Sequence, residues 1–104
     1  MSDSSLVQLA LAFPTASERP LLALLYERDP ELGGFSILGA AGHGHGFAHA
    51  SIQEQVSGQA DRRLLLAVMP QATARQLLQR LRRELPAARI TWWLTPVLDF
   101  GRLA

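Results

Sequence analysis

The order of the apolar segments constrains the fold of this chain most strongly. Residues 6–13 alternate between large apolar and small or polar side chains, which is typical of a strand with one buried face. Residues 64–69 form a continuous apolar run, as expected for a strand that is covered on both faces. Leucines at helical spacing follow each of these segments. The first group of leucines lies between Ser17, which can cap a helix, and Asp29-Pro30, which ends a helix. The sequence therefore predicts two strands, each followed by a helix.

Two further apolar segments complete the pattern. Residues 35–38 follow a glycine pair and predict a short strand, and residues 89–95 alternate and predict a last strand. The resulting order is β-α-β-β-α-β. This is the α+β, ferredoxin-like sandwich, in which two helices cover one face of an antiparallel sheet. We expect one domain over residues 1–104, since a chain of this length is typical of a single domain.

Adjacent tryptophans in the last predicted strand must point to opposite faces of the sheet. One of Trp92 and Trp93 can then fill the core, and the other needs a cover. Because large exposed apolar patches are rare on monomers, we expect the second ring to lie in an intermolecular surface.

The composition favours a packed core and argues against several kinds of partner. Hydrophobic residues make up 48% of the chain and charged residues 18%, which is too apolar for intrinsic disorder. A net charge of +1 favours neither nucleic acid nor an anionic membrane as a partner. No apolar run approaches the ~18 residues of a membrane span, so no direct membrane insertion is expected. The polar first residues do not resemble a signal peptide, and we expect a cytoplasmic protein.

Cysteine and lysine are missing from the sequence, and their absence excludes several chemistries. The chain has no cysteine, which excludes disulfides, thiolate nucleophiles and cysteine-ligated metal clusters. All ten basic residues are arginine, so no lysine can form a Schiff base or hold phosphate in a P-loop. The carboxylates are scattered and no Gly-x-Ser-x-Gly motif occurs. We therefore expect no enzymatic activity.

The segment 39–62 carries the strongest sign of a binding site. It holds five of the eight glycines and all three histidines, without a sustained period. Loops of this length are uncommon in compact domains unless they are functional or disordered. Neutral imidazole is the commonest protein ligand for transition metals, so His43, His45 and His49 are candidate ligands for Zn, Cu or Ni. The alternative is a glycine-rich loop in which the histidines are incidental.

Several short motifs along the chain carry a family resemblance. Over roughly residues 7–103 the sequence resembles the PII-like superfamily of trimeric signalling proteins. It is most similar to a small branch of PII-like proteins that are often encoded beside heavy-metal efflux pumps. The motifs are Gly34-Phe35, Gly42-His43-Gly44, residues 54–58, residues 90–97 and Gly101-Arg102.

The resemblance implies an assembly and a set of ligand sites. It implies a homotrimer with its sheets facing inward, with residues 39–62 as the T-loop and with ligand clefts between subunits. In PII proteins such clefts hold adenine nucleotides, but this chain lacks the glycine-rich phosphate loop after the second helix and the lysine at the T-loop base. The candidate ligand-binding residues that remain are Glu54, Arg62, Arg63 and Arg102.

Three functional hypotheses follow from the sequence and the resemblance. The leading one is a non-enzymatic trimeric regulator that binds a divalent transition metal and contacts a heavy-metal efflux component, a membrane-protein partner, through residues 39–62. The second is a sensor of adenine nucleotides or small anions that uses intersubunit arginines. The third is an adaptor that binds a protein partner and no ligand.

Overall fold

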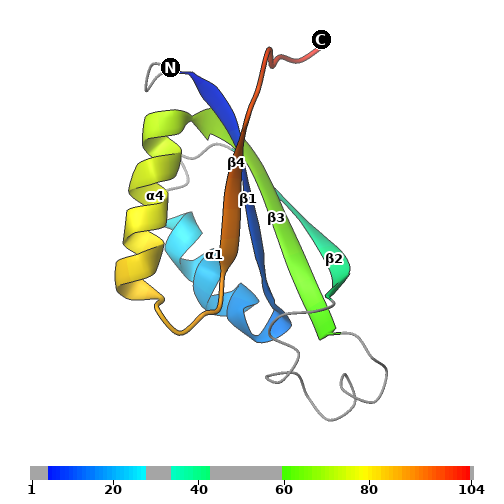
Figure 1. Ribbon diagram of the computed structural model, residues 1–104, viewed down its shortest axis with the longest axis vertical. Coiled ribbons are helices and arrows are strands. Elements are labelled where there is room, and N and C mark those ends of the chain that lie inside the picture. The colour runs from blue at the N-terminus through cyan, green and yellow to red at the C-terminus, as the bar shows by residue number, and fades with distance from the viewer. Residues whose placement is uncertain (1–4, 28–33, 43–59, 104) are drawn as a thin grey trace.

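The computed structural model describes residues 5–27, 34–42 and 60–103, and these confirm the predicted β-α-β-β-α-β order (Figure 1). The strands form one antiparallel sheet in the order β2-β3-β1-β4. The strands are β1 (Leu6–Pro14), β2 (Ser36–Gly42), β3 (Ala60–Pro70) and β4 (Thr91–Pro96); the helices are α1 (Glu18–Tyr26), α4 (Gln71–Glu84) and the short 3-10 turn η1 (Thr15–Ser17).

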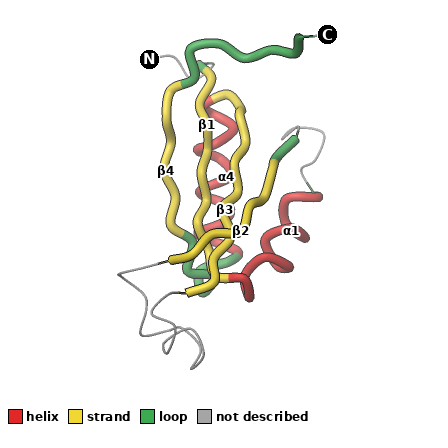
Figure 2. Tube along the Cα trace, turned by 90° about the vertical axis from the view of Figure 1, so that its right-hand side faces the viewer, coloured by secondary structure: helices red, strands yellow, loops and turns green. Residues whose placement is uncertain are grey.

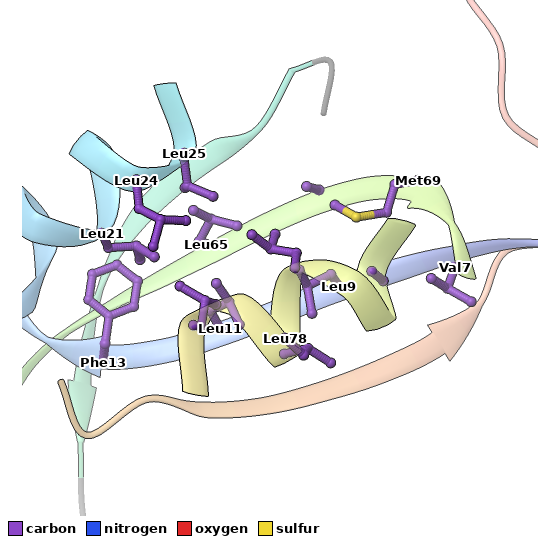
Figure 3. Packing of buried hydrophobic residues seen from close by; sticks show 14 residues of the cluster. Val7, Leu9, Leu11, Phe13, Leu21, Leu24, Leu25, Leu65, Met69 and Leu78 are labelled. Atoms are coloured by element: carbon purple, nitrogen blue, oxygen red, sulfur yellow. The ribbon is translucent and has the colours of Figure 1, made fainter. Parts of the chain in front are cut away.

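Both α1 and α4 lie on the same face of the sheet, and the core fills the space between these two layers (Figure 1). The core side chains of β1 and β3 are those at odd positions, because alternate residues of a strand point to one face. Leucines of both helices pack onto them (Figure 3). The largest fully buried side chains are Phe13, Leu9, Leu11, Leu21, Leu25, Leu65, Met69 and Leu77.

The strands extend further into the glycine-rich segment than the sequence pattern predicts. Strand β2 continues to Gly42 and β3 already begins at Ala60, so both ends of the segment 39–62 belong to the sheet. Pairing through backbone groups needs no apolar side chain, which is why Gly39, Ala40 and Ala41 join the sheet without an alternating pattern. The connection between the two strands is therefore residues 43–59, which lie outside the described part of the chain.

Ser17 precedes α1 as predicted, but its side chain does not cap the helix. The hydroxyl of Ser17 is buried and donates a hydrogen bond of 2.6 Å to the carbonyl oxygen of Ala88, in the connection between α4 and β4. A buried carbonyl without a partner would cost free energy, and this bond removes that cost. Ser17 thus ties the start of the first helix to the connection before the last strand.

Replacing Ser17 with alanine is expected to lower the free energy of unfolding by about 1–3 kcal/mol, because the buried carbonyl of Ala88 loses its donor. Chemical denaturation of the two proteins measures the difference. Thr15→Ala, at an exposed position two residues earlier, is the matched control and should change stability by less than about 0.5 kcal/mol. Equal effects of the two substitutions would show that the bond to Ala88 contributes nothing.

The two helices are also linked to each other by charge. The guanidinium group of Arg80 in α4 donates hydrogen bonds to the carboxylates of Glu84, one turn further along, and Glu27, just after α1. These contacts raise the pKa of Arg80, and the hydrogen bond to Glu84 is the largest cause.

Neither α1 nor α4 is long and apolar enough to cross a membrane, and the rest of the described chain holds no helix that is.

Candidate functional site

In the described part of the chain, no helix or strand covers the face of the sheet opposite α1 and α4. The pairing register places Leu66, Ala10 and Trp93 side by side across three strands, and Leu64, Ala12 and Thr91 in the next row. Figure 2 views the sheet from this side, with α4 behind the strands and α1 at the right, beside β2. We call it the open face; its residues are Gln8, Ala10, Ala12, Ser36, Leu38, Ala40, Arg62, Leu64, Leu66, Val68, Thr91, Trp93 and Thr95.

The open face is almost entirely uncharged. Leu38 is 47% exposed and Trp93 is 43% exposed, and Leu64, Leu66 and Val68 are only partly covered by their neighbours. Among the strand residues that form this face, Arg62 is the only charged one. The open face therefore has the composition of an interface between proteins. Monomeric proteins rarely leave such an apolar patch exposed.

The two tryptophans point to opposite faces of β4, as predicted, but neither of them is fully buried. Trp93 lies on the open face, while Trp92 lies on the helix side and is 39% exposed. Strand β4 is at the edge of the sheet, so Trp92 reaches only the margin of the core. There it lines a groove of about 270 Å³ with Leu78 and Leu81 of α4. The expectation that one ring fills the core is therefore wrong.

A pocket lies at one end of the open face, where β2 ends and β3 begins. Its volume is about 330 Å³. Small residues of β1 and β2 line it together with Arg62, Arg63 and Leu64 of β3 and with Thr91 and Trp93 of β4. Because it lies beside Gly42, the last residue before the segment 43–59, we call it the loop-end pocket.

The two neighbouring arginines of β3 have different surroundings. The Nε of Arg63 donates a hydrogen bond of 3.0 Å to Oε1 of Glu18 at the start of α1. Arg62 points to the open face, and its side chain lies against Gly42: a Cβ atom at that position would be 2.7 Å from Cγ of Arg62. No ion pair within the described residues involves Arg62. Arg62 is therefore the better placed of the two to bind an external anion.

Arg102, the third candidate arginine, lies elsewhere. It lines a different hollow, of about 570 Å³, with Phe35 of the chain before β2, Phe100 of the C-terminal tail, and Leu66 and Val68 of the open face. Within one chain the structure therefore does not bring Arg102 into the same pocket as Arg62 and Arg63. Glu54 lies outside the described residues.

The predicted metal ligands His43, His45 and His49 also lie outside the described residues. Within the parts of the chain that are described, no group of three or more histidine or acidic side chains is arranged to hold a metal ion. The metal prediction therefore remains untested by this structure.

Thr91 and Trp93 line the loop-end pocket, although nothing in the sequence alone connects them with Arg62. About thirty residues separate them from Arg62 along the chain, and only the pairing of both β3 and β4 with β1 brings them onto one surface. Alternation in the last strand does place Thr91 and Trp93 on one face. The strand order needed to place Arg62 beside them has no local sequence signal.

Two helices on one face of an antiparallel sheet of order β2-β3-β1-β4 define the ferredoxin-like fold of PII-like proteins, and comparison with solved structures supports this class. The chain superposes on a DUF3240 family protein from Shewanella baltica OS155 with a TM-score of 0.76 and 20% identity, over 100% of both chains. It superposes on CPII, a nitrogen regulatory PII-like protein from Thiomonas intermedia K12, with a TM-score of 0.68 and 18% identity, over 93% of both chains. That structure contains ADP, AMP and bicarbonate.

The family follows from the sequence itself. Residues 3–104 match the family described as "Protein of unknown function (DUF3240)", and the chain belongs to this family. Among curated proteins, none matches the chain significantly. The two structural likenesses, one of them to a PII-like protein, confirm the predicted fold.

Proposed function

We propose that this chain is the subunit of a non-enzymatic regulatory homotrimer of the PII-like type. The observation that carries the proposal is the open face, which is largely apolar, carries one charged strand residue and is covered by no helix or strand of the described chain. Further copies of the same chain supply such a cover, because burial of apolar surface is the main driving force of stable assembly. The fold shared with PII-like proteins favours three copies with their sheets turned inward.

The ligand proposed for this trimer is a divalent transition metal, Zn, Cu or Ni, bound by His43, His45 and His49. Three imidazoles within seven residues supply the donor type that these metals prefer. The resemblance to PII-like proteins encoded beside heavy-metal efflux pumps favours a metal as ligand and an efflux component as the partner that contacts residues 39–62. Binding in this segment would then alter the contact with that partner.

Replacing His43, His45 and His49 together with alanine is expected to abolish metal binding. Isothermal titration of metal-stripped protein with Zn, Cu and Ni ions should show saturable binding in the unmodified chain only. Affinity should also fall as the pH drops through about 6.5, because protonated imidazole cannot bind a metal.

The matched control replaces Ser51, Gln53 and Gln55, three polar residues of the same segment, with alanine. This variant should bind the metal as the unmodified protein does. Unchanged affinity in the triple-histidine variant, or an affinity that does not vary between pH 8 and pH 5, would contradict the proposed site.

A second candidate function is a sensor of adenine nucleotides or small anions that uses arginines at the subunit boundaries. The observation that favours it is the position of Arg62 on the open face without an ion pair in the described chain. A thermal-shift screen separates the two functions, since a ligand that binds only the native state raises its stability. Stabilisation by ATP, ADP or AMP and not by metals would favour the sensor; no stabilisation by either, with a co-purified protein, would favour an adaptor.

A further inference from the structure

The C-terminal tail, residues 97–103, carries the most exposed large apolar side chains of the described chain. Leu98 and Leu103 are fully exposed, and Phe100 is 64% exposed although it also lines a hollow of its own chain. The tail forms no helix or strand, and Figure 1 shows it leading away from the body of the molecule. Because exposed clusters of large apolar side chains are typical of interaction sites, we expect the tail to be covered by a partner.

An apolar groove lies at the other end of the molecule, where α4 ends and β4 begins (Figure 1). It is the groove of about 270 Å³ that contains Trp92, and we call it the Trp92 groove. Strand β4 is at the edge of the sheet, so no described strand covers the groove from its outer side. The apolar residues that line it are Leu78, Leu81, Leu85, Pro86, Ile90 and Trp92.

The charges of the groove and of the tail are complementary. Two exposed arginines, Arg82 and Arg89, line the groove, and neither belongs to an ion pair within the described residues. In the tail, Oδ1 of Asp99 accepts a hydrogen bond of 2.8 Å from the backbone N–H of Phe100. The tail thus presents a ring and a carboxylate close together, and the groove offers an apolar floor beside two guanidinium groups, which pair well with carboxylates.

The course of the tail favours a second copy of the chain as the owner of the groove that it fills. The backbone N–H of Val97 donates a hydrogen bond of 3.1 Å to the carbonyl oxygen of Leu6, which directs the tail away from the groove of its own chain. Seven extended residues span about 23 Å. The two shorter dimensions of the chain are 29 and 27 Å, so the tail can reach most of the way across a neighbouring copy.

A contact between the tail of one copy and the groove of the next joins two different surfaces. Such a head-to-tail contact gives each subunit one tail to donate and one groove to fill, and it closes into a ring when the rotation between subunits allows it. This geometry agrees with the proposed homotrimer, on which the inference rests.

We infer that the C-terminal tail of each subunit docks into the Trp92 groove of the next subunit. The ring of Phe100 packs against Trp92, and the carboxylate of Asp99 lies beside Arg82 and Arg89. An aromatic anchor in an apolar pocket is the kind of residue that carries most of the energy of an interface, while the charged pair fixes the orientation of the tail.

Engineered cysteines test this contact without background, because the chain has no cysteine of its own. In the variant that combines Asp99→Cys with Arg82→Cys, mild oxidation is expected to link most chains to a neighbour, since a disulfide needs Cα atoms within about 7 Å of each other. Denaturing electrophoresis without reductant separates linked from single chains. The matched control combines Asp99→Cys with Arg19→Cys, at an exposed arginine of α1 on the β2 side of the molecule (Figure 2), and should remain single chains.

Replacing Phe100 with alanine tests the anchor without an engineered bond. The substitution is expected to weaken association at least about 10-fold, as loss of a central aromatic anchor does in other interfaces. Light scattering over a dilution series measures the change, and circular dichroism verifies the fold. Tyr26→Ala removes another exposed ring, at the end of α1, and should leave association unchanged.

Links between chains in the Asp99→Cys and Arg82→Cys pair alone, together with weaker association of Phe100→Ala, support the inference. It is overturned by equal linking in both cysteine pairs, by a disulfide within a single chain, by no linking, or by unchanged association of Phe100→Ala. The mass of the unmodified protein separates this inference from the proposed assembly. A trimer in which tail and groove do not link contradicts the tail contact alone, whereas a monomer contradicts both.

Discussion

Replacing Leu66 with aspartate is expected to convert the proposed homotrimer into monomers. Leu66 lies on the open face in register with Ala10 and Ser36, near the middle of the sheet. Assembly would bury the new carboxylate in every subunit without a partner, and this costs several kcal/mol per buried charge. A penalty of that size weakens association by about a thousandfold or more.

Light scattering at a fixed protein concentration measures this effect, and circular dichroism verifies that the variant is folded. Gln79→Asp introduces the same residue at an exposed position of α4, on the other side of the molecule, and should leave the mass unchanged. If Leu66→Asp is folded and keeps the mass of the unmodified protein, the open face is not the interface.

Replacing Phe13 with alanine is expected to lower the free energy of unfolding by about 3–5 kcal/mol, the usual cost of removing a fully buried aromatic ring. Phe13 lies in the core cluster with the leucines of α1 (Figure 3). Since the total stability of a small domain is about 5–15 kcal/mol, the loss is a large share of it. Strand β1 pairs with both β3 and β4, so the same variant also weakens the support of the loop-end pocket.

Chemical denaturation at one protein concentration measures the loss, because the stability of an oligomer depends on concentration. Phe13→Leu is the graded control: leucine leaves a smaller cavity and should cost clearly less than alanine. Equal and small effects of both substitutions would contradict the assignment of Phe13 to the core.

The fold was largely predictable because its central strands carry strong local patterns. The alternation in β1 separates Phe13 and its buried neighbours from Ala12 and Gln8, and the leucines of both helices recur at helical spacing. The ends of β2 and β3 were not predictable, because Gly39, Ala40 and Ala41 pair through their backbones and show no pattern. The acceptor of the Ser17 hydroxyl was not predictable either, because its bond to Ala88 joins residues far apart in the sequence.

The candidate site was predictable only in part. The sequence indicates Arg62 and Arg63 as candidate ligand-binding residues. It does not indicate which of the two forms an ion pair within the chain. The fold decides this, because the helix layer brings Glu18 to Arg63 and leaves Arg62 on the open face. Thr91 and Trp93 join Arg62 in one pocket for the same reason. A site composed across several strands has no signal in any single stretch of sequence.

The mass of the unmodified protein in solution, measured by light scattering, tests the central claim most directly. The proposed assembly predicts a mass three times the 11.4 kDa of one chain, stable on dilution into the low micromolar range. A mass of 11.4 kDa would contradict the proposal that copies of this chain cover one another's open faces.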